Sequence, residues 1–182
     1  MSVQTAYATA PRAAYAGMLA DDSENDAITM SNQDSVSIPF GSPIVFKPSS
    51  TSDKDGALPA NSTDVLAGVL IHSHDFERTF SVPDSGGPVT VGELDTTGVA
   101  VGAEMAVLTK GTIWVLVHTA VVAGNAVHYS FSSNVTYSAA GQWGATAESG
   151  HSVLVSNARW ASSADASKFA KLRLGHSSLT AD

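Results

Sequence analysis

Two histidines, His72 and His74, are the residues whose spacing could most directly support chemistry. They stand two positions apart at the end of an apolar run, so in a strand both side chains point to the same face. Two imidazoles on one face could share a metal ion, but a closed zinc site needs about four ligands. No third candidate follows at a compelling spacing, and the chain has no cysteine. We therefore predict histidines that make hydrogen bonds at a strand end, and no bound metal.

The acidic run from Asp21 to Asp26, DDSEND, offers a second kind of site. Carboxylate oxygens are the ligands that calcium prefers. The run lacks both the glycine and the terminal glutamate of an EF-hand loop, however. A solvated acidic segment explains it better, and we predict no cofactor.

Three tryptophans could form a sugar-binding platform, because aromatic faces stack well on apolar surfaces. Trp143 is flanked by Gly141 and Gly144 and is predicted to lie in a loop, which makes it the best platform candidate. Trp114 lies within the run TIWVLV and is expected in the core. Trp160 is expected to close a barrel or to lie at a subunit contact. A carbohydrate-binding β-sandwich is thus one functional alternative.

Linear signatures of catalysis are missing from the chain. The patterns GxSxG, HExxH, GxGxxG and the P-loop do not occur in it. A Ser-His-Asp triad could still assemble in space without leaving a linear trace, so a hydrolase stays open as a second alternative. Since no residue pattern favours a reaction, the sequence predicts a protein that is not an enzyme and has no catalytic residues.

The segment from Ala14 to Thr29 looks built to contact another protein, because it combines an apolar patch with a run of acids. It precedes every strand-like pattern, and a segment this short cannot bury its side chains in a core of its own. We predict a docking arm whose deletion, over residues 1–26, leaves a folded core. The candidate residues for contact with a partner or a sister subunit, together with Trp160, are Tyr15, Met18, Leu19, Asp21, Asp22, Glu24 and Asp26.

Composition and charge restrict the classes of partner. Charged residues make up 14% of the 182 residues, and the net charge of −8 is uneven: residues 21–104 carry −11 and residues 105–182 carry +2. An acidic chain repels a phosphate backbone, so direct nucleic-acid binding is disfavoured. The acidic and basic regions could orient subunits or partners. The N-terminus lacks the apolar core of a secretory signal, and the apolar runs are too short to span a bilayer. We expect synthesis in a cytoplasm and no membrane contact.

Short strands between turn signals predict a mainly β protein. The expected architecture is a single compact sandwich or barrel, jelly-roll-like, with an extended N-terminal arm (1–34), a β-rich domain (35–176) and a C-terminal tail (177–182). The segments 106–108 and 112–117 form either a hairpin or one bulged strand. At most one short helix is expected, at 161–169. The remaining strand candidates are 36–40, 44–46, 65–72, 89–91, 127–131, 152–155 and 170–174.

Five motifs in a fixed order give the chain a family resemblance. They are AGMLADDSENDAIT, IPFGSPIVF, LPANSTDVLAGVLIHSH, LTKGTIWVLV and ARWASSADASKFAKLRL. Together they span about residues 14–174, and this series resembles the structural cement (capsid decoration) proteins of tailed bacteriophages. The loop at 47–57 is longer than in that pattern, and the stretch 133–151 does not match it.

The resemblance implies a compact β-rich protein of the virion that is made in the host cytoplasm. In the carbohydrate-binding alternative, the β-sandwich would be displayed on the virion surface. It would bind the outer surface of the major capsid shell, bridge neighbouring capsomers and stabilise the DNA-filled head. The implied partners are the major capsid protein and further copies of the chain, as a trimer or else a dimer. In this setting Tyr15, Met18 and Leu19 would anchor the arm, and the acids from Asp21 to Asp26 would steer it towards basic capsid surface.

Overall fold

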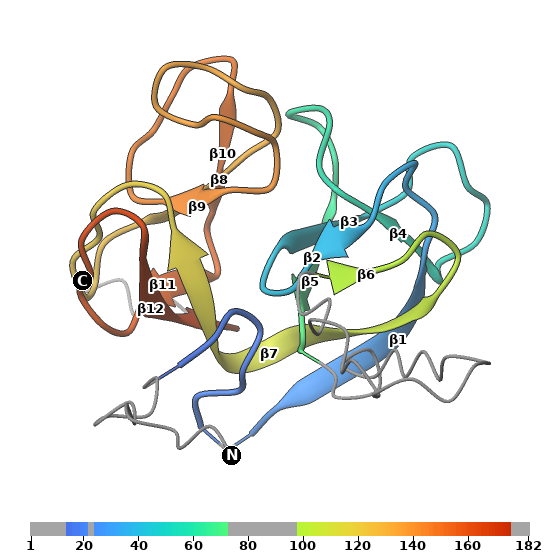
Figure 1. Cartoon of the computed structure of the whole chain (residues 1–182), viewed down its shortest axis with the longest axis horizontal. Helices are drawn as coiled ribbons and strands as arrows, with labels where there is room; N and C mark the ends of the chain where they lie inside the picture. The colour runs from blue at the N-terminus through green and yellow to red at the C-terminus, as the bar shows by residue number, and fades with distance from the viewer. Residues whose placement is uncertain (1–13, 22–23, 73–97, 176–182) are drawn as a thin grey trace, which may run out of the picture.

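A single long strand, β7 (Glu104–Val117), runs through both halves of the molecule in the computed structural model (Figure 1). The structure describes residues 14–21, 24–72 and 98–175. The first half of β7 pairs with β1 (Asp26–Asn32) and β5 (Leu66–Leu70), whereas its second half pairs with β12 (Lys168–Leu174). Gly111 lies at the change of partners with φ +133°, a conformation that favours glycine. The two predicted segments of β7 are therefore one strand and not a hairpin.

The first lobe is a small barrel. Strand β1 pairs with β4 (Asp55–Ala57), β4 with β3 (Pro43–Phe46), β3 with β5, β5 with β7, and β7 again with β1, so the ring of strands closes. A two-stranded ribbon of β2 (Ile38–Pro39) and β6 (Gly98–Val99) accompanies the barrel. Closure leaves this lobe without an open sheet edge, which limits pairing with other chains. Its core consists of Met30, Ile38, Phe40, Ile44, Leu70, Val99, Met105 and Val107.

The second lobe is a curved sheet that uses the other half of β7. Its strands follow the order β11, β12, β7, β9, β8, β10. A backbone hydrogen bond of 2.8 Å from Gly124 N to Trp160 O joins β11 to the segment before β8, which makes the lobe barrel-like. The bounds of its further strands are Val127–Ser130 for β8, Trp143–Gly144 for β9, Ser152–Val155 for β10 and Ala158–Trp160 for β11.

The two lobes form one packed unit. Val69 and Leu108 stand on barrel strands, yet their side chains belong to the hydrophobic core of the second lobe. Trp143 is almost fully buried in that core, and its indole Nε1 donates a hydrogen bond of 2.7 Å to Gly41 O of the first lobe. A buried indole gains from such a partner, because its N–H would otherwise lose water without compensation. Trp143 therefore connects the lobes, and the prediction that it lies in a loop as a sugar platform is wrong.

Most predicted strands are confirmed, and the fold class is mainly β with a barrel-like sheet. The segments 44–46, 65–72, 127–131, 152–155 and 170–174 coincide with β3, β5, β8, β10 and β12, whereas 36–40 contains only the two residues of β2. The candidate strand at 89–91 lies outside the described residues.

The possible helix at 161–169 is absent. Residues 161–162 form a bend and residues 166–167 a turn, and Ala164 makes an isolated bridge to Val121. Strand β12 begins at Lys168 after Ser167, which has φ +61°. Small alanine and serine side chains tolerate a turn as readily as a helix, and the pairing of β12 with β7 decides between them. The part of the chain that the structure describes contains no helix capable of crossing a membrane.

His128 on β8 gives the fold a testable dependence on pH. Its side chain is buried, its Nδ1 has no hydrogen-bond partner, and burial lowers the pKa of its imidazole from the ordinary 6.5. Below about pH 6.5 this imidazole is protonated more readily in the unfolded chain than in the folded chain. The free energy of unfolding therefore falls as the pH drops below about 6.5.

We predict that His128→Leu makes this loss smaller between about pH 7.5 and 5.5. Urea unfolding of both proteins at the two pH values measures the difference. An equal loss in the variant and the wild type would contradict the prediction.

Candidate interaction surfaces

Residues 14–20, which we expected to reach away from the domain, lie against β7. Gly17 N donates to Trp114 O, and Trp114 N donates to Met18 O, both at 2.8 Å. Leu19 forms an antiparallel bridge with Ile113 and packs against the core of the second lobe. The segment thus acts as a short strand on the edge of β7, and residues 26–32 form β1. Deleting residues 1–26 would remove these contacts with β7, and the expectation that a folded core is left stays a prediction.

Tyr15 anchors this segment beside the strand-end histidine. Its ring meets the imidazole of His72 edge-on with centroids 4.5 Å apart, and Phe40 lies 4.4 Å from the same imidazole. Aromatic contacts of this kind explain His72 as a packing residue. His74 lies outside the described residues. No group of three potential metal ligands occurs among the residues that are described.

The acidic run is tied to a lysine of the same chain. Glu24 forms an ion pair of 2.9 Å with Lys110 on β7, and the hydrogen bond and charge of Lys110 lower the pKa of the Glu24 carboxyl. Asn25 Nδ2 donates a hydrogen bond of 2.7 Å to the backbone oxygen of Asp21. Asp26 is exposed at the start of β1, and Asp22 lies outside the described residues. The described acids therefore lie along the edge of β7, beside its own cation.

Strands β7 and β12 share an outer face that sequence analysis did not identify. Ile113, Val115 and Val117 point into the core together with Ala170, Leu172 and Leu174. Side chains alternate along strands, so the residues between them point outwards. Met18 pairs with Trp114 directly beside the Leu19 bridge and shares this side. We call Met18, Trp114, Leu116, Phe169, Lys171 and Arg173 the β7–β12 face.

The β7–β12 face has an apolar centre and a cationic edge. Leu116 is 50% exposed and stands in register with Phe169. The ammonium of Lys171 lies 5.1 Å from the ring centroid of Trp114, a cation–π contact. Arg159 on β11 is paired with Arg173 and adds a further cation. Aromatic residues and arginine around an apolar centre are typical of protein interfaces. Trp114 is thus half-buried on a surface, and its predicted place in the core is wrong.

Two loops carry exposed valines on the other side of the molecule. Loops 58–65 and 131–142 project from the first and second lobe in the same direction, towards the top of Figure 1. Val65 is 65% exposed, and the side chain of Val135 is exposed completely. We call these loops the two prongs.

Hydrogen bonds hold both prongs in shape. Asp64 Oδ2 accepts bonds of 2.8 Å from the backbone N–H groups of Ala60 and Asn61. Asn134 Oδ1 accepts from Tyr137 N, and the hydroxyl of the buried Tyr137 donates to Thr146 O at 2.7 Å. The prongs therefore present their valines from fixed loops.

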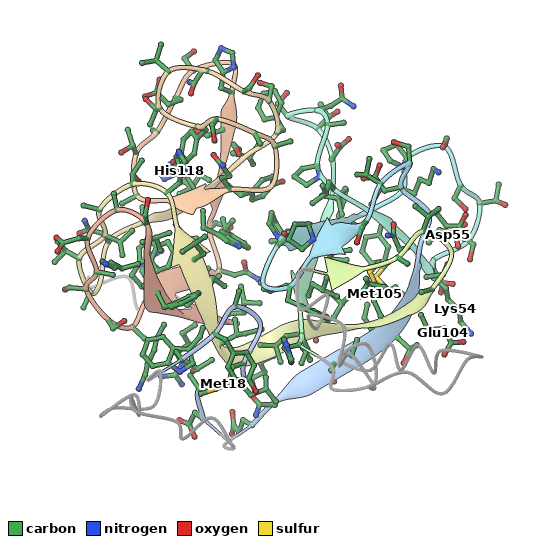
Figure 2. All side chains as sticks on the ribbon, viewed as in Figure 1. Met18, Lys54, Asp55, Glu104, Met105 and His118 are labelled. Atoms are coloured by element: carbon green, nitrogen blue, oxygen red, sulfur yellow. The ribbon has the colours of Figure 1, made fainter. Side chains whose placement is uncertain are left out.

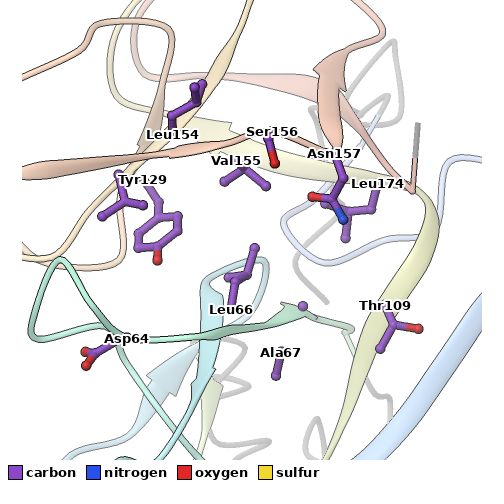
Figure 3. Close-up of a pocket in the computed structure, with 12 residues that line it drawn as sticks. Asp64, Leu66, Ala67, Thr109, Tyr129, Leu154, Val155, Ser156, Asn157 and Leu174 are labelled. Atoms are coloured by element: carbon purple, nitrogen blue, oxygen red, sulfur yellow. The ribbon is translucent and has the colours of Figure 1, made fainter. Parts of the chain in front are cut away.

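A cavity of about 240 Å³ lies between the lobes and is shown in Figure 3. Its polar side chains are those of Asp64, Thr109, Tyr129, Ser156 and Asn157. No histidine or lysine lines it, and its one carboxylate, Asp64, accepts two backbone N–H bonds within its own loop instead of a hydroxyl of the cavity. This cavity gives the hydrolase alternative no support.

Comparison with known proteins identifies the family. The family model described as structural cement protein (E217 gp24/Pam3 gp6) matches residues 3–175, which is nearly the whole chain. The chain belongs to the structural cement protein family of bacteriophages. A chain from the solved capsid of Myoviridae phage XM1 has a similar fold: the TM-score is 0.62 at 15% identity, over 95% of this chain and 97% of that one. No curated protein matches. The resemblance seen in the sequence is confirmed, and the cement protein is a structural component of the virion capsid.

One of the predicted contact residues, Trp160, is not available on the surface of the cement protein. It is 1% exposed and packs in the core of the second lobe, which fits the expectation that it closes a barrel. Leu19 is partly buried against the same core, and its role as a contact stays a prediction. Of the remaining candidates that the structure describes, Met18 belongs to the β7–β12 face. Asp21 and Glu24 line a hollow at its edge together with Lys110 and Arg173.

Gly17 provides a test of how segment 14–20 is held. It has φ +81°, and a Cβ at this position would lie 2.7 Å from His72 N and 3.0 Å from Leu70 O. Gly102 has a similar φ of +76°, but a Cβ there would meet no atom within 4 Å. Replacing Gly102 by alanine therefore measures the cost of the backbone conformation without a steric clash.

We expect Gly102→Ala to cost about 1 kcal/mol of unfolding free energy, and Gly17→Ala to cost a further 1–3 kcal/mol, on the order of other overpacked sites. Chemical denaturation measures both values. Equal losses would show that segment 14–20 is not packed as described.

Proposed function

We propose that this cement protein binds the outer surface of the major capsid shell, bridges neighbouring capsomers and stabilises the DNA-filled head. Membership in the family supports the association with the capsid. The architecture supports bridging, because two lobes that share β7 and a common core move as one body. A rigid body that contacts two capsomers resists their separation without any chemical step.

The observation that carries the proposal is the arrangement of the two prongs. Each lobe contributes one prong, and both point in the same direction (Figure 1). An exposed valine gains about 1.5–3 kcal/mol when it is buried fully in a contact. Each contact is modest, but two contacts on one rigid body strengthen each other, and many copies repeat them over the shell. Val65 and Val135 are therefore assigned to two neighbouring capsomers.

The predicted arm residues have a different place in this proposal. Tyr15, Met18 and the acids Asp21 and Glu24 lie along β7, on the side of the molecule away from the prongs. We assign this side to contacts between copies of the cement protein, with a trimer favoured and a dimer as the alternative. Bridging of the shell would then depend on the prongs, and assembly of copies on the opposite side.

Val65→Asp and Val135→Asp test the bridge. Each should weaken binding about tenfold or more, because an unpaired carboxylate is costly to bury in an apolar contact. The matched controls Ser62→Asp and Ser133→Asp add the same charge to the same loops, outside the valine contacts, and should bind almost normally. Cosedimentation with expanded, DNA-free shells of the parent phage measures binding. Normal binding of both valine variants would refute the role of the prongs.

A further inference from the structure

The first lobe ends in a second apolar surface, at the opposite end of the molecule from β12. Val36 and Val101 are 51% and 56% exposed on the loops 33–37 and 100–103. Both loops meet at Asn32, which is completely buried. We call Val36 and Val101 the valine tip.

Asn32 fixes the shape of the valine tip. Its Nδ2 donates hydrogen bonds to Val36 O at 3.1 Å and to Val99 O at 2.9 Å. Its backbone oxygen accepts a bond of 2.7 Å from Gly102 N. A buried amide with this many partners holds both loops rigidly, since each lost bond would leave a desolvated polar group. The hydrogen bonds of the loops thus hold two valines out into solvent.

Acidic residues surround the valine tip. Ser31 precedes Asn32 and stands in register with Asp55 on β4 and with Glu104 on β7, so these two carboxylates flank the base of the tip. Asp34 lies on the tip loop itself, where its carboxylate accepts the backbone N–H of Ser35 and of Leu58. Figure 2 shows Asp55 and Glu104 at this end of the molecule, with Lys54 as a neighbouring cation. A second cation, the ammonium of Lys47, donates a hydrogen bond to Gln33 O on the tip loop.

The valine tip complements the β7–β12 face in charge and in polarity. The tip is apolar with a mainly acidic surround, whereas the face is apolar with Arg159, Lys171 and Arg173 at its edge. Figure 2 labels Glu104, beside the tip, at the right and Met18 of the face near the bottom, so the two surfaces are separate. We propose that the β7–β12 face of one copy binds the valine tip of a second copy, head to tail.

This geometry determines the kind of assembly. A contact between two different surfaces is heterologous, so every copy keeps one free tip or face until a ring closes. A closed ring of three satisfies all tips and faces, which accords with the trimer favoured above. Opposite charges at the rim guide the approach and set the register, and the apolar centre supplies most of the affinity. Neither the face nor the tip includes Val65 or Val135, so the assembly leaves these two valines available for the shell.

Leu116→Asp on the face and Val101→Asp on the tip test the contact in solution without capsids. Analytical ultracentrifugation of the full chain between about 1 and 100 µM should show wild-type oligomers, with the dissociation constant raised about tenfold or more in either variant. Lys171→Glu is a second face variant that reverses a charge at the cationic edge and removes the cation–π contact with Trp114, and the charge-dependent part of its effect should shrink at high salt. Val65→Asp is the control: it should assemble like the wild type while losing shell binding.

Mixing the two variants gives the decisive result. The face variant keeps a normal tip and the tip variant keeps a normal face, so an equal mixture should form a complex of two chains and nothing larger. A wild type that stays monomeric, a face or tip variant that assembles normally, or a mixture that stays monomeric would each overturn the proposal. Circular dichroism and thermal unfolding of each variant establish that the fold is kept. Because no shell is present, failure here leaves the bridging proposal untouched.

Discussion

The shared use of β7 is the constraint on which the rest of the structure depends. One strand supplies the closing wall of the barrel and the central strand of the second lobe, so its alternation must satisfy two cores in succession. Met105 and Val107 face the barrel core, and Ile113 and Val115 face the other. Gly111 lets the strand change direction between them. Neither lobe can rotate against the other without breaking backbone hydrogen bonds, and a protein that reinforces a shell needs this stiffness.

Local patterns in the sequence were sufficient to predict most strands, because short alternating runs between turn residues are typical of strands and rarely form another element. They could not show which face of a fully apolar run is covered. Trp114 and Leu116 lie in TIWVLV, where every second residue is buried, yet the outward residues are as hydrophobic as the inward ones. The charged residues Lys171 and Arg173 alternate with apolar residues in β12 and so indicate which side of that strand faces outwards. Because β12 pairs with β7, the outward side of β7 lies on the same face of the sheet.

Contacts between distant residues account for the features that sequence analysis placed wrongly. Trp143 precedes Gly144 in a stretch of turns, and partners distant in the sequence make it a core residue: Val117, with which it pairs, and Gly41, over a hundred positions earlier. The segment 14–20 has no strand pattern of its own and becomes a strand because β7 offers it an unpaired edge. Long-range pairing of this kind overrides local propensity, so a segment's own residues cannot reveal it.

The exposed apolar residues of the cement protein stand on loops of fixed shape. Scattered hydrophobic side chains are normal, but those at the prongs and the valine tip stand on loops that buried Asn32 and Tyr137 hold in place. Fixing a loop before binding lowers the entropy lost on association, so small contacts suffice. A protein whose contacts repeat around a symmetric shell gains more from such fixed, modest contacts than from a single strong one, because errors in assembly can still be reversed.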